Sequence, residues 1–392
     1  MTAARSSASR AADLRRTLAN QLAADHALTD PEWRKAVEAV PREAFLGDAV
    51  FLRRDEEEGT RWEPLRRTKE SEEKWLELAH TNATWVTQVD GVDAADATEP
   101  LTGAPTSSLS LPTVVVQMLE VSGLTDGESV LEIGTGTGYS AALMCHRLGQ
   151  EAVTSIEVDP VVAGRARRTL TDLGYEPTLA VGDGLRGYDR DAFEYDRLIA
   201  TCAVRYVPAS WMWQVRDGGT ITTPLWGWMN GYALAHLTLA DDGTASGRFS
   251  TIDVSFMPAR AHISPPLTYY VASSRRGDTR DSKVDPSLLG DWTGRFVAQL
   301  AAPSAQLLGG GDEVTLFDVG TGSRASTAPN PSGGWRVCQH GPLRLWDAVE
   351  DALLTWQEAG SPHQSGFGLT VTRDRQYVWL GTPEGPSWEL PA

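Results

Sequence analysis

The chain has 392 residues, of which 41% are hydrophobic and 22% charged, and this composition is typical of a globular protein. Its length exceeds that of one ordinary domain, so we expect a principal domain with a second domain or a large appendage. The net charge of -17 argues against a protein that binds nucleic acid by neutralising phosphates. The acidity fits either a plain solvated surface or a basic peptide partner, so charge does not identify the ligand.

Cysteine usage and the N-terminal segment predict a cytoplasmic protein. The three cysteines (Cys145, Cys202 and Cys338) lack C-x-x-C spacing, which indicates neither a disulfide framework nor a thiolate zinc site. The seven histidines are scattered without the spacing of metal ligands, so no metal is expected. No apolar signal region follows the N-terminal arginines, and no apolar run is long enough to cross a membrane. We therefore expect no membrane partner.

The N-terminal region predicts two helices followed by an irregular insertion. Residues 11–24 carry apolar side chains at helical spacing, and the Thr-Asp-Pro-Glu run at 29–32 supplies an N-cap and first-turn proline for a helix through Val40. From Arg53 to Pro100 the sequence is charged and irregular. We interpret this stretch as an insertion or lid, which could pack through three tryptophans: Trp62, Trp75 and Trp85.

After Pro112 the pattern becomes a regular alternation of helices and strands. Such an alternation predicts βαβ units and a mainly parallel sheet, hence a doubly wound, Rossmann-like α/β fold. Beyond residue 275 short strands separated by Gly, Pro and Ser turns predict a C-terminal α+β region. The expected helices are 113–121, 140–147, 161–173 and 345–358, and the expected strands are 129–133, 152–158, 178–181, 197–201, 220–224, 232–239 and a pair within 368–380.

A glycine-rich turn follows the first of these strands. Residues 130–139 read Val-Leu-Glu-Ile-Gly-Thr-Gly-Thr-Gly-Tyr, a buried strand that runs through Gly-x-Gly-x-Gly into a helix. The glycines permit a ligand to approach the backbone closely at the switch point of the sheet. The spacing is not the G-x-G-x-x-G that suits a pyrophosphate. Glu132 would favour the cationic amino and sulfonium side of S-adenosylmethionine and would repel a dinucleotide phosphate.

Acidic residues also end the next two strands. Glu157 is placed to accept the ribose hydroxyls, although NAD-binding folds use an acid in the same way, and Asp183 is placed to accept an adenine amino group. Each acid taken alone could equally be a helix N-cap or a turn residue. Three acids at successive strand ends favour a nucleoside-binding site.

Several motifs together resemble the protein L-isoaspartyl O-methyltransferases. Residues 130–139 are similar to that family's first motif, and residues 36–45 (Ala-Val-Glu-Ala-Val-Pro-Arg-Glu-Ala-Phe) to its Val-Pro-Arg-Glu-x-Phe segment. Residues 106–112 (Thr-Ser-Ser-Leu-Ser-Leu-Pro) resemble its Gln-Thr-Ile-Ser-x-Pro active-site loop, and residues 195–203 and 218–221 resemble its later strand motifs. The resemblance covers residues 20–240.

The resemblance implies a class I methyltransferase that uses S-adenosylmethionine and releases S-adenosylhomocysteine. Ser110, with Ser108 beside it, would be the active-site hydroxyl, although Ser110 could also cap the following helix. Ser107, Val204 and Arg205 would contact substrate. The division implied is 1–112 for the N-terminal helices, insertion and active-site loop, 113–274 for the cofactor-binding domain, and 275–392 for a C-terminal domain that could recognise substrate. Residues expected to hold the cofactor are Ser110, Glu132, Gly134, Thr135, Gly136, Gly138, Glu157, Val158, Asp183, Gly184, Leu185 and Thr201.

The reaction implied is methylation of an aspartate or isoaspartate carboxylate in a peptide or protein. In this family the ester then closes spontaneously to an aspartimide, and methanol leaves. Ser107 replaces the family's glutamine, and the insertion and C-terminal region are additions. These departures resemble methyltransferases that modify one aspartate of a ribosomally made, often macrocyclic precursor peptide, which we expect here. The alternatives are general isoaspartate repair, a small-molecule methyltransferase, and a non-catalytic cofactor-binding scaffold.

Overall fold

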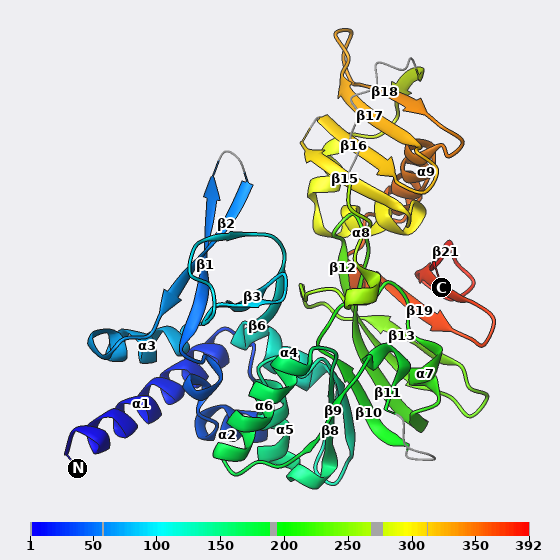
Figure 1. Ribbon diagram of the computed structural model, residues 1–392. Helices are drawn as coiled ribbons and strands as arrows, with labels where there is room; N and C mark the ends of the chain where they lie inside the picture. The colour runs from blue at the N-terminus through cyan, green and yellow to red at the C-terminus, as the bar shows by residue number, and fades with distance from the viewer. Residues whose placement is uncertain (1, 57–58, 189–193, 268–276, 312, 392) are drawn as a thin grey trace. The chain divides into compact units, whose positions relative to one another are not determined.

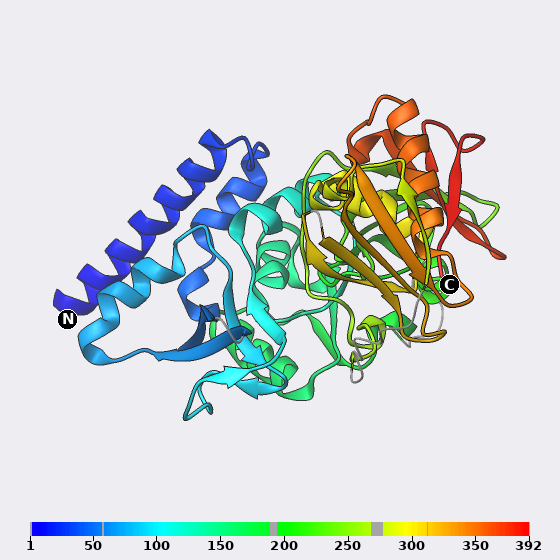
Figure 2. The same cartoon turned by 90° about the horizontal axis from the view of Figure 1, so that it is seen from above.

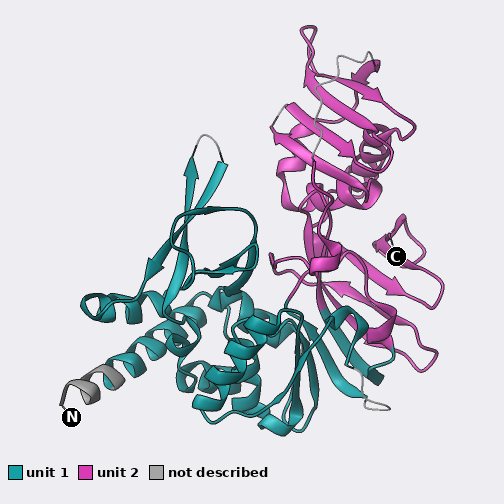
Figure 3. Cartoon of the chain, viewed as in Figure 1, with its two compact units in different colours: residues 1–201, 213–222 teal, residues 202–212, 223–392 magenta. Residues whose placement is uncertain are grey.

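The computed structural model describes residues 2–56, 59–188, 194–267, 277–311 and 313–391 (Figure 1). Their contacts group into two compact units, shown in Figure 3. Unit 1 comprises residues 1–201 and 213–222, and unit 2 comprises residues 202–212 and 223–392. The three-part division expected from the sequence stays a prediction.

The centre of unit 1 is a parallel sheet with the order β11-β10-β7-β8-β9. After β9 the chain returns to β10 beside β7, so the direction of winding reverses there and creates a switch point at the carboxyl end of β7. Every residue of β7 is buried, as expected for a strand covered on both faces. The strands are β7 (Val130–Ile133), β8 (Val153–Glu157), β9 (Thr178–Val181), β10 (Tyr195–Ala200) and β11 (Val215–Trp226), whose residues 223–226 belong to unit 2.

The helices between these strands pack on the sheet. Helix α5 (Tyr139–Leu148) contacts β8, and α6 (Pro160–Asp172) contacts β8 and β9. Helix α4 (Pro112–Val121) precedes β7. This alternation of strands and helices follows the order predicted from the sequence, because the helices carry apolar stripes and the central strand β7 is short and buried.

Two helices open the chain as predicted. They are α1 (Thr2–Ala24) and α2 (Pro31–Ala39), followed by the 3-10 turn η1 (Arg42–Phe45). The Asp30 carboxylate accepts the Glu32 N–H at 2.7 Å and so caps α2. Figure 2 shows helix α3 (Glu72–Ala79) beside α1, where Arg10 of α1 pairs with Glu77 at 2.9 Å.

The expectation that residues 53–100 are irregular is wrong, because this stretch belongs to a folded sheet with its own core. Its strands run β4-β3-β1-β2-β5, and β6 pairs with β3. The charged residues occupy exposed positions toward the ends of β1 and β2, while an apolar cluster lies beneath the sheet. The strands are β1 (Ala49–Glu56), β2 (Gly59–Arg66), β3 (Trp85–Val89), β4 (Val92–Asp93), β5 (Leu101–Thr102) and β6 (Pro105–Leu109), and the cluster comprises Ala49, Phe51, Trp62, Val86, Val89, Ala94 and Ala97.

Unit 2 contains two antiparallel arrangements of strands. One runs β12-β13-β19-β20-β21 and the other β14-β18-β17-β16-β15, with helices α8 and α9 in contact with each other and α9 packed on β17 and β18. The predicted change to short strands in this region is confirmed. The elements are α7 (Ala209–Met212), β12 (Tyr232–Leu239), β13 (Ala245–Phe249), β14 (Asp278–Ser282), α8 (Trp292–Ala301), β15 (Ala305–Gly310), β16 (Glu313–Asp318), β17 (Arg324–Pro329), β18 (Trp335–His340), α9 (Leu345–Glu358), β19 (Phe367–Val371), β20 (Gln376–Leu380) and β21 (Ser387–Glu389).

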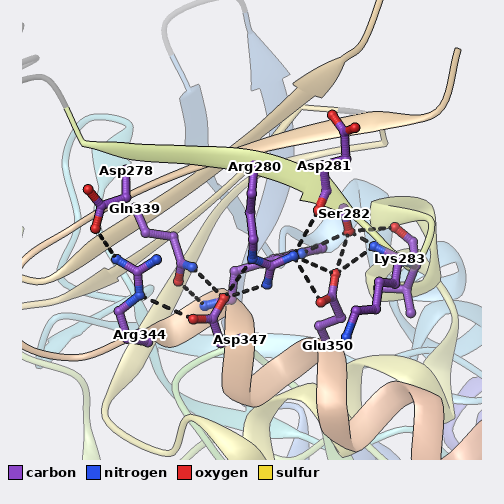
Figure 4. Close-up of polar contacts among 11 residues, drawn as sticks. Asp278, Arg280, Asp281, Ser282, Lys283, Gln339, Arg344, Asp347 and Glu350 are labelled. Carbon is purple, nitrogen blue, oxygen red and sulfur yellow. Dashed lines mark hydrogen bonds and ion pairs between the residues drawn. The ribbon is translucent and has the colours of Figure 1, made fainter. Parts of the chain in front are cut away.

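A polar network fastens β14 to α9 (Figure 4). Arg280 donates to Asp347 and, at 3.1 Å, to the buried Glu350. Glu350 also accepts the Lys283 backbone N–H at 2.7 Å and the Ser282 hydroxyl at 3.1 Å. Because the Glu350 carboxylate has donors from three different residues, it is paired in spite of its burial.

The described ranges contain neither a candidate membrane-spanning helix nor a candidate metal cluster. No helix there is both long and apolar enough to cross a membrane. No cluster of three or more His, Cys, Asp or Glu side chains with metal-ligand geometry occurs among the same residues. The remaining short 3-10 turns are η2 (Lys69–Ser71), η3 (Gln150–Ala152), η4 (Gly184–Arg186), η5 (Arg260–His262), η6 (Pro286–Gly290) and η7 (Gln364–Gly366).

Candidate active site

The glycine turn lies at the carboxyl end of β7 and begins helix α5. Gly134, Gly136 and Gly138 have φ angles of 98°, 54° and 93°, which residues with a Cβ atom rarely adopt. The Gly134 N–H donates to the Ile156 carbonyl at 2.8 Å, which ties the turn to β8. A Cβ on Gly138 would lie 3.3 Å from side-chain atoms of α6, so this glycine also permits close helix packing.

Glu132 is completely buried one residue before the end of β7. Its carboxylate accepts the Ser155 hydroxyl at 2.6 Å and the Ser140 hydroxyl on α5. Burial raises the pKa of Glu132 to about 7, although both serine hydrogen bonds oppose that rise. Thr135, also predicted to hold the cofactor, pairs its hydroxyl with Ser155 at 2.6 Å. Both residues therefore support the glycine turn from within, and direct contact with a cofactor stays a prediction for each.

Glu157 lies at the carboxyl end of β8, next to the glycine turn. One carboxylate oxygen accepts the Gly136 N–H at 2.9 Å and the other accepts the Asp159 N–H at 3.0 Å. Each oxygen keeps a further lone pair, so the carboxylate could still accept hydroxyls. This arrangement places Glu157, which was predicted to bind the ribose, beside the glycine turn.

Three more of the predicted cofactor residues, Asp183, Gly184 and Leu185, lie just after β9. The Asp183 carboxylate caps η4 by accepting the Leu185 N–H at 3.0 Å, and its side chain is 42% exposed. This geometry is therefore compatible with Asp183 as a turn residue and also with its predicted role as a cofactor ligand. Val158 is 43% exposed after β8, which leaves an apolar side chain at the same edge of the sheet. The buried Gly184 lies against Ile133 of β7.

Thr201 has a backbone partner at the end of β10. Its hydroxyl donates to the Ile133 carbonyl at 3.2 Å and to the Gly134 carbonyl. The side chain thus holds the start of the glycine turn. Contact between Thr201 and the cofactor stays a prediction.

Residues 106–112, which we call the serine segment, form a strand over most of their length, where a loop was expected. In β6, Ser107 pairs with Gln88 and Ser108 pairs with Val86 of β3. Ser107 is buried and its hydroxyl accepts from Thr87 at 3.1 Å. The Ser108 carbonyl lies 3.8 Å from where a Cβ on Gly136 would be, so β6 reaches the glycine turn.

Ser110 follows the strand, is half-buried, and its hydroxyl bonds to none of the residues that the structure describes. The alternative capping role of Ser110 is not used, because the N-cap of α4 is Leu111 and no side chain of the cap contributes.

Two residues with no assigned role connect the inserted sheet to the cofactor-binding strands. Gln88 of β3 donates to the Asp159 carboxylate at 3.2 Å and accepts the Thr106 hydroxyl at 2.7 Å. Asp159 also caps α6, accepting the Val161 N–H at 2.9 Å. The Asp-Pro pair at 159–160 signals the cap, but no local pattern indicates Gln88, because its partner is far away in the sequence.

Val204 and Arg205 belong to unit 2, and their predicted contact with substrate stays a prediction. The Val204 N–H donates to the Pro224 carbonyl at 2.9 Å. The Arg205 guanidinium lies 3.7 Å from the centre of the Trp228 ring, and its backbone N–H donates to His262 Nδ1 at 3.1 Å. Arg205 is therefore held within its own unit.

The residues at the edge of the unit 1 sheet fit S-adenosylmethionine. The glycine turn offers open backbone, since among the described residues only the Ser108 carbonyl lies within 4 Å of a Cβ built on Gly136. Glu157 and Asp183 supply acceptors at neighbouring strand ends, and Val158 supplies an exposed apolar side chain. A nucleoside needs this combination of hydroxyl acceptors, an amino acceptor and an apolar surface.

Comparisons with known proteins point to one enzyme family. A model of the family described as Protein-L-isoaspartate(D-aspartate) O-methyltransferase (PCMT) matches residues 88–261. A protein-L-isoaspartate O-methyltransferase of Ignicoccus hospitalis is 41% identical over 128 residues, which are 32% of this chain and 60% of the relative. One of Anaeromyxobacter dehalogenans is 36% identical over 176 residues, which are 44% of this chain and 82% of the relative.

A solved structure of a protein-L-isoaspartate O-methyltransferase has the same fold. Its TM-score is 0.55 at 19% identity, and the match covers 94% of this chain and all of the other chain. The predicted doubly wound α/β fold is thereby confirmed. The likeness extends beyond residue 275, so the C-terminal region is not peculiar to this chain. The chain belongs to the protein-L-isoaspartate O-methyltransferase family, whose members use S-adenosylmethionine.

Proposed function

We propose that this chain transfers a methyl group from S-adenosylmethionine to an aspartyl or isoaspartyl carboxylate of a peptide or protein. The observation that carries the proposal is the approach of the serine segment to the glycine turn, with the Ser108 carbonyl 3.8 Å from the Cβ position of Gly136. This approach places a hydroxyl-bearing segment next to the strand ends that fit the cofactor. Residues 105–110 would then form the acceptor side of the site and residues 134–138 the cofactor side.

Methylation of a carboxylate needs little acid or base chemistry. S-Adenosylmethionine, when bound, supplies a methyl group on a sulfonium centre. A carboxylate oxygen forms the bond to the methyl carbon while the carbon–sulfur bond breaks, and no proton has to move. The protein's contribution is therefore alignment and exclusion of water. The Ser110 hydroxyl, which bonds to no described residue, is available to donate to the substrate carboxylate.

The relatives favour isoaspartate as the substrate. The relatives from Ignicoccus hospitalis and Anaeromyxobacter dehalogenans are named protein-L-isoaspartate O-methyltransferases. The length of the chain no longer argues for a dedicated substrate, because a solved member of this family aligns over 94% of it. The remaining argument for a dedicated precursor peptide, with ester closure to an aspartimide, is Ser107 in place of the family's glutamine. We therefore place general isoaspartate methylation first and the precursor peptide second.

Intact mass spectrometry distinguishes these substrates. The enzyme and S-adenosylmethionine are incubated with an isoaspartyl linear peptide, its aspartyl counterpart, and an aspartyl macrocyclic peptide. We expect a gain of about 14 Da on the isoaspartyl peptide, from one methyl group, because carboxylate alignment is the main source of rate in such a site.

Two other results would contradict this expectation. Methylation of the macrocycle alone, followed by loss of methanol, would establish the dedicated-peptide alternative. If no peptide is methylated although the protein binds S-adenosylhomocysteine, the proposal is wrong and the non-catalytic scaffold gains support.

A further inference from the structure

Arg42 is a completely buried arginine whose partners are backbone carbonyls. Its guanidinium donates to three of them, those of Ala79, Ala83 at 3.2 Å and Ser110 at 2.7 Å. None of the acidic side chains within the described ranges pairs with it. Burying a charge without a counter-ion is costly, so the three charge-assisted hydrogen bonds offset a large desolvation penalty.

The same guanidinium also touches the cofactor side of the site. Its Cζ atom lies 5.5 Å from the centre of the Tyr139 ring, and Tyr139 is the first residue of α5 after the glycine turn. One side chain therefore contacts both the Ser110 carbonyl and the helix that the glycine turn begins. Burial lowers the pKa of Arg42 to about 10, so the guanidinium stays charged at neutral pH.

Asn82 holds the other side of the serine segment. Its side-chain oxygen accepts the Thr113 N–H at 3.1 Å, and its side-chain nitrogen donates to the Thr113 hydroxyl at 2.7 Å. Thr113 lies in the first turn of α4, where the cap residue Leu111 gives no side-chain hydrogen bond. Asn82 thus supplies an acceptor to this helix start from a distant segment.

We propose that Arg42 and Asn82 are positioning residues that clamp residues 110–113 and thereby set the direction of the Ser110 hydroxyl relative to the glycine turn. This inference rests on the proposed methyl transfer. Both residues act through others and do not reach the reacting atoms themselves. Ala79, Asn82 and Ala83 lie at the end of the inserted helix α3 and in the loop that follows, so the insertion contributes directly to the geometry of the site.

Steady-state kinetics of Arg42→Lys, Arg42→Met and Asn82→Ala test the clamp. An ammonium group cannot span three carbonyls with the fork of a guanidinium, so even the lysine variant should lose much of the alignment. We expect kcat on the accepted peptide to fall about tenfold to a hundredfold, with the largest fall for methionine. The Kd of S-adenosylhomocysteine should change by less than about threefold, since none of the proposed cofactor ligands is altered.

Arg16→Met is the matched control, because Arg16 lies in α1 with a side chain that is 60% exposed. It should keep the wild-type kcat. A purely structural role for Arg42 predicts something else, namely that kcat per folded molecule stays at the wild-type value while the melting temperature falls. That result would overturn the proposal. If Arg42→Met does not fold, the lysine and Asn82 variants still decide the matter.

Hydrogen exchange supplies a readout that does not depend on activity. In the S-adenosylhomocysteine complex, the peptide covering residues 105–113 should lose protection in the Arg42 and Asn82 variants, while β8 keeps its protection. Unchanged exchange in this peptide would contradict the clamp even if no substrate has been found. If the wild type methylates no peptide but the exchange pattern changes as expected, the methyl-transfer proposal fails and the clamp stands.

Discussion

At the scale of single residues, Glu132 is expected to make the stability of the protein depend on pH. Burial raises its pKa from 4.5 to about 7, so the folded state binds this proton more tightly than the unfolded state does. The stabilisation that the protonated Glu132 carboxyl provides is complete below pH 4.5. It is lost as the pH rises toward 7, and the free energy of unfolding then falls by on the order of 3 kcal/mol. Glu132→Gln should remove this dependence, which urea unfolding at pH values between 5 and 8 would measure.

The comparison with Glu132→Gln isolates the effect from other titrating groups. The variant should become more stable relative to the wild type as the pH rises, and the difference should level off above pH 7. Glu151→Gln, at an exposed position, is the control and should follow the wild type at every pH. A constant difference between Glu132→Gln and the wild type across the range would show that Glu132 does not titrate there.

Residue identity in the candidate site could be predicted from the sequence more readily than residue contacts. The glycine turn and the acids at the strand ends follow from motif spacing, and the structure brings them to one edge of the sheet. The burial of Glu132 against Ser140 and Ser155 could not be predicted, because it depends on how α5 and β8 pack. The same limit applies to Arg42, whose carbonyl partners lie 37 or more positions away in the sequence.

At the scale of elements, the turn after β9 is expected to tolerate a methyl group at one glycine and not at another. A Cβ on Gly184 would lie 2.5 Å from Ile133 Cγ2, whereas no atom of the residues that the structure describes lies within 4 Å of a Cβ on Gly182. Ile133 is β-branched and precedes the glycine turn, so it has little freedom to move away. Gly184→Ala should lower the free energy of unfolding by about 1–3 kcal/mol.

Thermal unfolding and S-adenosylhomocysteine titration of the two variants check this prediction. Gly184→Ala should lose cofactor affinity as well as stability, because a displaced Ile133 shifts the start of the turn. Gly182→Ala should stay within about 0.5 kcal/mol of the wild type. Equal behaviour of the two alanine variants would mean that Ile133 adjusts freely.

Elements with a strong period could be predicted, and elements held by distant pairing could not. The apolar periodicity of 345–358 predicted α9 to its ends, and the strand 232–239 was equally clear. β1 and β2 escaped prediction because their distal halves are charged and exposed, so only pairing and the cluster around Phe51 and Trp62 reveal them as strands. β6 was expected to be a loop because residues 106–112 resemble the family's active-site loop, and its pairing with β3 is a long-range contact that this motif does not indicate.

At the scale of the whole molecule, the grouping of contacts into two units predicts that damage to one unit is felt mainly there. Glu350 on α9 offers a test within unit 2. Burial works against its ionisation, but hydrogen bonds from Arg280 and the Lys283 N–H outweigh it and hold the pKa of Glu350 below its ordinary value. Its contribution to stability is therefore present at neutral pH and is lost as the pH falls through the lowered pKa.

Glu350→Ala should destabilise unit 2 by about 1–3 kcal/mol, because the Lys283 N–H loses its acceptor. Arg280 keeps Asp347, and the Ser282 hydroxyl keeps the Val284 carbonyl. Hydrogen exchange should show the loss of protection in β14 and α9, with β7 and β8 unchanged.

Asp351→Ala, an exposed neighbour on the same helix, should leave both regions as in the wild type. The variant should also lose less stability than the wild type on acidification, since the group that titrates is gone. A loss of protection spread equally over β7, β8 and α9 would show instead that the chain unfolds as one cooperative body, and the two units would then have no separate stability.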